Sequence, residues 1–153
     1  MIAPVAIVAT RDGTRTWGMT VSAFSVLCLD PPSFVLCVNA ATATAAHVRE
    51  QGELGLNILA DHQSAISQRC ARPGESKHID PSLLVARDDG SSRLLLRDTV
   101  ASFECDARTL DVDGSHLLVV ATVRRGSAAD AQPLLYGSGT YLRGVPLEPA
   151  VIE

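Results

Sequence analysis

The stretch GMTVSAFSVLCLDPPSFVLCVN, residues Gly18–Asn39, decides the fold class of this chain. It is mostly apolar, but the hydroxyl residues Thr20, Ser22 and Ser25 interrupt it, and the sequence DPP divides it. Runs of β-branched and aromatic residues bounded by Gly, Pro and Asp are typical of strands. We therefore predict two core strands, GMTVSAF and SFVLCVN, with DPP reversing the chain between them.

Strand-like runs also occur along the rest of the chain. Apolar and polar residues alternate over 102–110, which indicates a half-buried strand. The Asp-Gly turn in DVDGS follows directly, so we predict a hairpin that pairs 102–110 with 116–125. The other predicted strands are APVAIVAT (3–10), WGMTVSAF (17–24), SFVLCVN (33–39) and LGLNIL (54–59).

Two segments favour short helices. ATAAHVREQG, residues 43–52, is rich in Ala and ends in a glycine suited to a C-cap. In ADHQSAISQRCA, residues 60–71, Asp61 is a candidate N-cap, and residues 127–133 are predicted to be a loop. Helices do not alternate with strands, so the predicted fold is mainly β, an antiparallel barrel with a few short helices. We expect residues 1–153 to form a single domain.

The composition argues against binding to nucleic acid and against insertion into a membrane. The formal net charge is −4 and the basic residues are scattered, so nucleic-acid binding is not expected. No apolar run approaches the roughly 20 residues that span a bilayer, and the first residues lack the basic region of a signal peptide. The four cysteines form no C-x-x-C pair, which predicts buried free thiols in a reducing cytoplasm. They are Cys28, Cys37, Cys70 and Cys105.

Motifs of hydrolytic and metal-dependent enzymes are missing from the sequence. It contains no G-x-S-x-G elbow and no P-loop, and GSGTYLRG does not match G-x-G-x-x-G. The four histidines have no spacing typical of metal ligands. Neither a hydrolase nor a metalloenzyme is therefore predicted.

Five blocks of sequence, taken in order, carry a resemblance to a known family. They are GMTVSAFSVLCLDPPSFVLCVN, GELGLNILADHQSAISQRCA, FECDART, DGSHLLVVATV and QPLLYGSGTYLR. Together, from about Val5 to Arg143, they resemble the flavin reductase family of FMN-binding split barrels. The members of this family are small reductase components of two-component flavin-dependent monooxygenases.

The resemblance implies both a fold and an activity. The implied fold is an antiparallel split β-barrel that forms a homodimer, with the flavin at the interface between the subunits. The implied activity is reduction of FMN or FAD by NADH or NADPH, after which the reduced flavin passes to a separate monooxygenase. The choices between FMN and FAD, and between NADH and NADPH, stay open.

The first candidate binding segment is part of the opening stretch. A flavin ring needs a flat apolar surface and a few donors, which backbone N–H groups and small hydroxyls supply best. Thr20, Val21, Ser22 and Ala23 offer both, and the resemblance assigns them to the flavin ring. Read without the resemblance, they are ordinary strand residues.

The second candidate segment is NAATAT, residues Asn39–Thr44, between a strand and a helix start where free amides favour an anion. It resembles the N-K-S-S-x-T segment that holds the ribityl and phosphate groups of the flavin. We therefore expect binding roles for a set of its residues, which are Asn39, Ala41, Thr42 and Thr44. Ala40 and Ala41 replace the family's Lys and Ser, so Lys77 is a candidate for the missing charge, although a solvated loop lysine is the alternative.

His116 is the candidate catalytic residue. The G-D-H histidine of the family faces the flavin and helps to place the nicotinamide, since hydride transfer depends on positioning. The sequence here is Gly114-Ser115-His116, so the acidic neighbour is absent. The simpler interpretation is that His116 is an ordinary histidine at a hairpin turn.

Two alternative functions stay open. The same barrel could bind a flavin without accepting hydride, because the acid beside His116 is missing and the chain begins almost at the first strand. It could also bind a different ligand, such as haem or a pyridoxal-type phosphate. An absorbance spectrum of the purified protein separates these alternatives.

Overall fold

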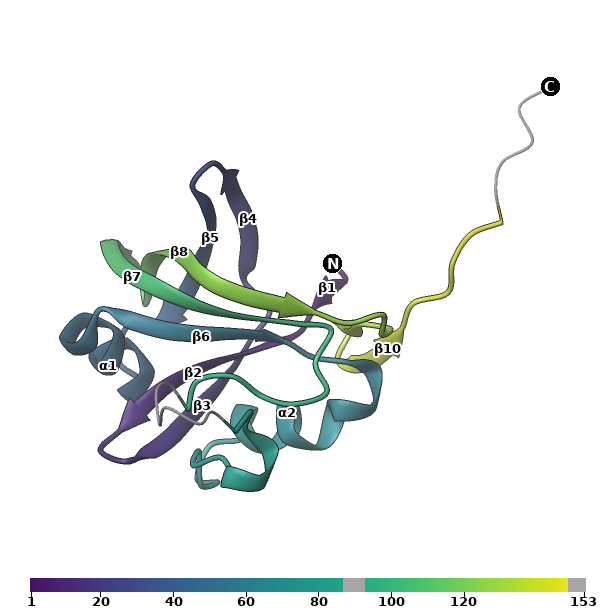
Figure 1. Ribbon diagram of the computed structural model, residues 1–153, viewed down its shortest axis with the longest axis horizontal. Helices are drawn as coiled ribbons and strands as arrows, with labels where there is room; N and C mark the ends of the chain where they lie inside the picture. Colours follow the sequence, from purple (N-terminus) through teal and green to yellow (C-terminus); the bar gives the residue numbers. More distant parts are fainter. Residues whose placement is uncertain (87–92, 149–153) are drawn as a thin grey trace.

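The computed structural model describes residues 1–86 and 93–148, which form a strongly curved sheet with helices at its sides (Figure 1). The helices are α1 (Ala43–Gln51), α2 (Ser64–Ala71) and the short 3-10 helices η1 (Asp61–Gln63) and η2 (Pro81–Leu83). The strands are β1 (Ala3–Pro4), β2 (Ala6–Asp12), β3 (Arg15–Val21), β4 (Phe24–Leu29), β5 (Pro32–Asn39), β6 (Glu53–Ile58), β7 (Ala101–Asp113), β8 (His116–Ala128), β9 (Leu134–Gly137) and β10 (Thr140–Arg143).

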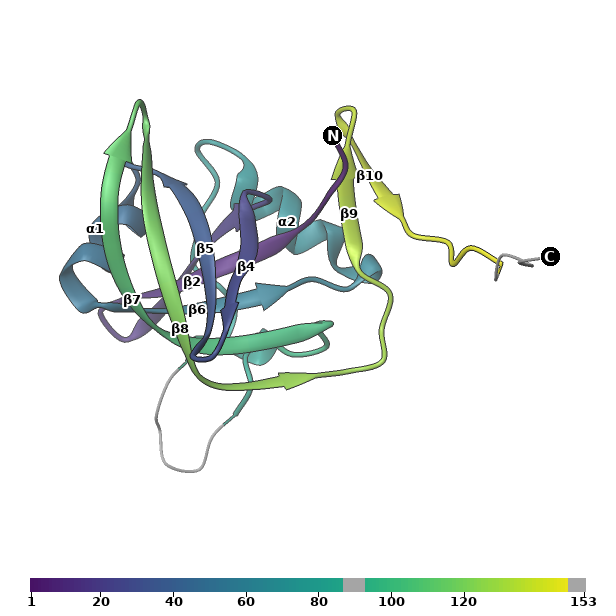
Figure 2. The same cartoon turned by 90° about the horizontal axis from the view of Figure 1, so that it is seen from above.

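The strands form two antiparallel sheets. Seven of them follow the order β3-β2-β6-β7-β8-β5-β4, and a small sheet has the order β1-β9-β10. Figure 2 shows how the large sheet curls around its own interior. The prediction of a mainly antiparallel β fold is confirmed. Within the described residues β3 and β4 are the two edges of the large sheet, so the sheet is open and not closed as a barrel.

The opening stretch contains three strands, and the prediction of two was wrong. β3 ends at Val21, Ser22 and Ala23 form a link, and the DPP sequence turns the chain between β4 and β5. β3 pairs with β2, whereas β5 pairs with β4 and β8, so GMTVSAF and SFVLCVN are not neighbours in the sheet. A continuous apolar run does not reveal this break, because the link keeps small residues that also suit a strand.

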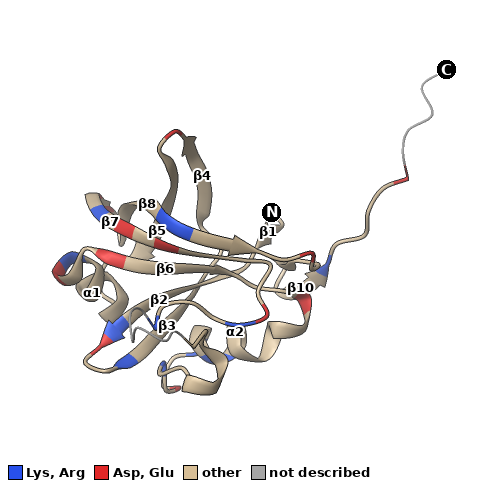
Figure 3. Ribbon diagram, viewed as in Figure 1, with Lys and Arg blue, Asp and Glu red and all other residues tan. Residues whose placement is uncertain are grey.

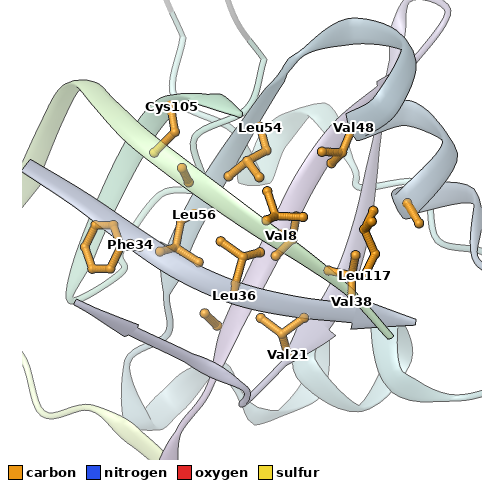
Figure 4. Close-up of a cluster of buried hydrophobic side chains, with 14 residues drawn as sticks. Val8, Val21, Phe34, Leu36, Val38, Val48, Leu54, Leu56, Cys105 and Leu117 are labelled. Atoms are coloured by element: carbon orange, nitrogen blue, oxygen red, sulfur yellow. The ribbon is translucent and has the colours of Figure 1, made fainter. Parts of the chain in front are cut away.

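The main hydrophobic core lies inside the curve of the sheet (Figure 4). Side chains of six strands meet there with Val48 of α1, and most of them are fully buried. A second core lies on the other side of β2, where Ile7 packs with Cys70 of α2 and with Ile79. β2 is therefore buried on both faces, and each fully buried Leu or Ile contributes about 1.5–3 kcal/mol to folding.

Helix α1 begins and ends where its sequence predicts. Thr42 is the N-cap, and its side chain accepts a hydrogen bond of 3.3 Å from the Ala45 amide. Gly52 adopts a left-handed φ of 66° at the C-terminus, and its amide donates to the Val48 carbonyl at 3.0 Å. These two caps fix the position of the α1 N-terminus.

The predicted N-cap at Asp61 was wrong. Asp61 begins the 3-10 helix η1, and α2 starts only at Ser64. The carboxylate of Asp61 instead forms an ion pair of 2.6 Å with Arg143 of β10, and the side chain of Gln63 accepts from the Ala60 amide at 3.0 Å. The acidic side chain is thus used in a contact with β10 that sequence cannot reveal.

The β7–β8 hairpin is longer than its sequence predicts. β8 runs to Ala128, so Ser127 and Ala128 belong to the strand, whereas residues 129–133 lie outside the strands as predicted. The turn at its tip has Gly114 with a φ of 56°, as the Asp-Gly pair predicts. Within the part of the chain that is described, no helix is both long and apolar enough to span a membrane.

The four cysteines are free, but they are not all buried. Cys70 and Cys105 lie in the cores, and burial raises the pKa of Cys105 to about 12. Cys37 is half-buried and Cys28 is exposed on β4, so the prediction of four buried thiols was wrong for these two. Cys28 is exposed because β4 is an edge strand whose side chains are mostly exposed.

Candidate functional site

The strand pairing brings two distant candidate segments together. Asn39, the last residue of β5, lies opposite His116, the first residue of β8. One residue further on, the amide of Ala40 donates to the carbonyl of Ser115 at 2.9 Å. The start of α1 is thereby held beside the tip of the β7–β8 hairpin.

The turn between β5 and α1 is held by its own polar groups. The side-chain oxygen of Asn39 accepts from the Ala41 amide at 2.9 Å, and the Thr42 hydroxyl donates to the Asn39 carbonyl at 2.6 Å. The first amides of an α-helix have no preceding helical carbonyl, so those of Ala43 and Thr44 have no partner inside α1, whereas the Ala45 amide is capped by Thr42. These amides and the positive end of the helix dipole suit an anionic group.

Thr44 differs from the other hydroxyl residues of this segment. Its side chain is fully buried, and among the described residues its hydroxyl oxygen has no hydrogen-bond partner. A buried hydroxyl without a partner costs free energy, so such a group is uncommon unless a ligand or water completes it. Thr44 is therefore the strongest indication of a ligand at the α1 N-terminus.

The link between β3 and β4 approaches the same end of β5. Ser22 and Ala23 are exposed, and the carbonyl of Ala23 accepts from the Cys37 amide at 2.9 Å. Val21 is buried in the main core near Val38 (Figure 4). The link thus exposes its backbone and the Ser22 hydroxyl to solvent, and the buried Val21 anchors it. Its contact with Cys37 places it beside β5, two residues before Asn39.

Thr20 and Lys77 lie beside α2 and are engaged there. The Thr20 hydroxyl donates to the Ser67 carbonyl at 2.7 Å. The Lys77 ammonium donates to the carbonyls of Arg69, at 3.1 Å, and of Arg72, and so caps the C-terminus of α2. A role of either residue in flavin binding stays a prediction, and such a role would require each side chain to release its present partner.

The imidazole of His116 is exposed and oriented by its neighbour. Its Nδ1 lies 2.9 Å from the Ser115 hydroxyl oxygen, which leaves Nε2 for a ligand. Reasoning from sequence noted that an acid is missing at position 115 but missed that the serine hydroxyl contacts the ring. It also missed Tyr141, whose hydroxyl lies 2.8 Å from that of Ser67, beside the carbonyl that Thr20 contacts.

Comparison with known proteins identifies the family. The flavin reductase like domain matches residues 1–144. The chain belongs to this family. It is 32% identical over 152 residues to an NADH:FMN oxidoreductase of Rhodococcus erythropolis, covering 95% of this chain and 77% of that protein. It is 31% identical over 147 residues to the reductase component of a 4-nitrophenol 4-monooxygenase/4-nitrocatechol 2-monooxygenase of Rhodococcus opacus, covering 95% and 76%.

Solved structures of flavin reductases share the fold. BorF, the flavin reductase component of a bacterial two-component tryptophan halogenase, superposes with a TM-score of 0.81 at 25% identity over 94% of this chain and 91% of its own. The Streptomyces globisporus NADH:FAD oxidoreductase SgcE6 gives a TM-score of 0.83 at 20% identity, over 95% and 87%. At this identity the second likeness shows the fold alone.

The residues at this site fit a flavin in part. The α1 N-terminus and the buried hydroxyl of Thr44 fit a phosphate group, and the exposed link at Ser22 and Ala23 fits a flat ring. The predicted cation beside the phosphate position stays a prediction, because the ammonium of Lys77 donates to the Arg69 carbonyl of α2 at 3.1 Å. Figure 3 shows basic residues scattered among acidic ones over the sheet and helices, with no continuous basic face in view.

Proposed function

We propose that this protein is a flavin reductase that uses NADH to reduce FMN or FAD and supplies the reduced flavin to a partner monooxygenase. The observation that carries the proposal is the pairing of His116 with Asn39 beside the buried hydroxyl of Thr44. It occurs in a family whose relatives include a protein named NADH:FMN oxidoreductase and a monooxygenase reductase component.

Each part of the site has one task in this proposal. The Ala43 and Thr44 amides and the Thr44 hydroxyl bind the flavin phosphate, and Asn39 and Thr42 hold the turn that presents them. The backbone of Ser22 and Ala23 receives the ring, because small side chains let a ring approach closely. The exposed side of Ala41 leaves room for the ribityl chain.

The chemistry at this site depends mainly on positioning. A bound flavin supplies the redox chemistry, since its ring accepts the hydride that NADH gives up. His116 orients the nicotinamide, with Ser115 fixing the ring by the contact at Nδ1. Because Ser115 is a neutral hydroxyl and not a carboxylate, its contribution is to orient the ring of His116, whose Nε2 is left to contact the nicotinamide.

The exposed edge of the large sheet supports a homodimer. β4 carries Val26, Leu27 and Leu29 with exposed fractions of 59%, 52% and 85%, on a hairpin that projects from the sheet (Figure 1). An unpaired apolar edge strand is an aggregation hazard unless another chain covers it. We infer that a second copy covers β4, giving a single-domain split barrel of residues 1–153 as an obligate dimer in the cytoplasm.

A second candidate function is flavin binding without reduction. Ala40 and Ala41 supply no cation beside the phosphate position, and Ser115 replaces an acid next to His116. Both changes weaken the site relative to the family pattern. In this candidate function the protein binds the flavin but does not catalyse hydride transfer to it. A yellow protein that oxidises neither NADH nor NADPH would favour this candidate.

The test of the proposal is a titration followed by turnover. FMN and FAD are titrated into the purified protein, and oxidation of NADH and of NADPH is then followed with each flavin. The proposal predicts saturable flavin binding and NADH oxidation that depends on both protein and flavin. Protein that binds neither flavin and oxidises neither nucleotide would rule it out.

A further inference from the structure

A surface cavity of about 420 Å³ lies apart from the residues assigned to the flavin. It opens where the β2–β3 turn meets the loop that follows α2, far along β3 from the Ser22–Ala23 link. In Figure 1 both segments lie in the lower part of the view, below the tip of the β7–β8 hairpin. Its polar lining includes Thr14, Ser76, His78 and the three arginines Arg15, Arg69 and Arg93.

The cavity is positively charged. Its three guanidinium groups come from separate segments of the chain, so their convergence is a product of the fold and not of a local basic run. Among the described residues of the lining, Asp80 is the one carboxylate, and the Ser82 amide donates to it at 2.8 Å. Hydrogen bonds from Ser82 lower the pKa of Asp80, so it is ionised, and the three arginines still outweigh it.

Two buried polar atoms in this lining lack partners. Among the described residues, Nε of Arg69 and Nδ1 of His78 are buried without a hydrogen bond. Both side chains are fixed: Arg69 donates to the His78 carbonyl at 2.7 Å, and Nε2 of His78 lies 3.2 Å from Asp12. An arginine is always protonated, so its Nε–H is a donor that requires an acceptor.

We propose that this cavity binds a phosphate ester group and has room for a mononucleotide. Guanidinium groups match phosphate oxygens in charge and in geometry, and the hydroxyls of Thr14 and Ser76 can add hydrogen bonds. A cavity of this size suits a small ligand. The inference does not rest on the proposed reductase activity, because no residue assigned to the flavin lines this cavity.

Calorimetric titration of the whole chain with AMP, adenosine and inorganic phosphate tests this site. AMP is expected to bind saturably, and adenosine, which lacks the phosphate, at least about tenfold more weakly. Phosphate that binds as tightly as AMP would identify free phosphate as the ligand of the same site. If AMP and phosphate show no saturable binding up to about 10 mM, the proposal is overturned.

Variants locate the site within the protein. Arg15→Gln combined with Arg93→Gln is expected to weaken AMP binding about tenfold or more, since each loses a charge-assisted hydrogen bond. Arg72→Gln, also an arginine but outside the cavity, is the control and should bind AMP as the parent does. Arg15→Gln alone, at an exposed residue, serves if the double variant does not fold. If Arg72→Gln loses as much AMP affinity as the cavity variants, the proposed site is overturned. Unchanged FMN binding in the cavity variants shows that the cavity is distinct from the flavin site.

Discussion

Asn39 and His116 face each other across the antiparallel pair of β5 and β8, although they are far apart in the sequence. This pairing fixes the α1 N-terminus relative to the backbone of His116 through strand hydrogen bonds, and the Ser115 hydroxyl then orients the imidazole. An anion held by the helix and a group held by His116 would therefore keep a constant separation. That constancy is what hydride transfer between two bound molecules needs.

His116→Ala is expected to raise the KM for NADH by about tenfold or more, because the nicotinamide loses an orienting hydrogen-bonding group. The Kd for FMN should change by less than about twofold, since the flavin contacts assigned above lie on other residues. Steady-state kinetics and a flavin titration measure the two quantities. His62→Ala, at an exposed histidine of η1, is the control. A loss of flavin affinity equal to the loss for NADH would contradict the assignment.

Thr44→Val should weaken FMN binding by about tenfold, and the stability of the flavin-free protein should not fall. The physical reason is that the Thr44 hydroxyl is buried without a protein partner, so its removal costs the folded chain nothing. Thr42→Ala is the contrasting variant, because it removes the N-cap and should cost about 0.5–2 kcal/mol. Urea unfolding and flavin titration separate the two effects. If Thr44→Val leaves FMN affinity unchanged, the hydroxyl does not contact the phosphate.

Ala40→Lys is expected to tighten FMN binding about fivefold by placing a cation beside the α1 N-terminus. Riboflavin, which lacks the phosphate, should bind the variant and the parent equally. The gain should shrink as salt is added, because the new charge is partly exposed. Ala46→Lys, at an exposed position further along α1, is the matched control. An equal gain for riboflavin would show that the added lysine acts elsewhere.

Arg125→Met should lower the free energy of unfolding by about 1–3 kcal/mol, since it removes a cation from a buried carboxylate. Glu104 is fully buried on β7, and the guanidinium of Arg125 pairs with it. The neighbouring Arg124 pairs with Glu53 at 3.2 Å and with Asp106 at 3.4 Å, near the surface. Arg124→Met should therefore cost about 1 kcal/mol or less. Denaturant unfolding measures the loss of unfolding free energy in both variants. Equal losses would contradict the predicted difference between Arg125 and Arg124.

Much of the fold followed from local patterns. The C-cap of α1 at Gly52 and the turn at Gly114 were predictable because each depends on a few adjacent residues. The break at Ser22 and the end of β8 were not, since pairing with the preceding strand decides them and the residues there carry no local sign of where the pairing stops. For the same reason Asp61 was assigned to a cap, whereas Arg143 pairs with it across a tertiary contact.

The candidate site was predictable in composition but not in arrangement. The sequence singled out Asn39, Thr44 and His116, and the pairing of β5 with β8 brings the first and last together. It could not show that Thr20 and Lys77 bond to α2, because those partners are backbone carbonyls of residues that no side-chain pattern marks. The arginine cavity was missed because its members are separated in the chain.

The most direct test of the account is anaerobic mixing of the FMN-bound protein with NADH. The visible absorbance of the oxidised flavin reports the outcome. We expect this absorbance to disappear at a rate that saturates with NADH concentration and falls about tenfold in His116→Ala at low NADH. If the absorbance persists with both NADH and NADPH, or disappears just as quickly for free FMN without protein, the proposed reductase site is wrong.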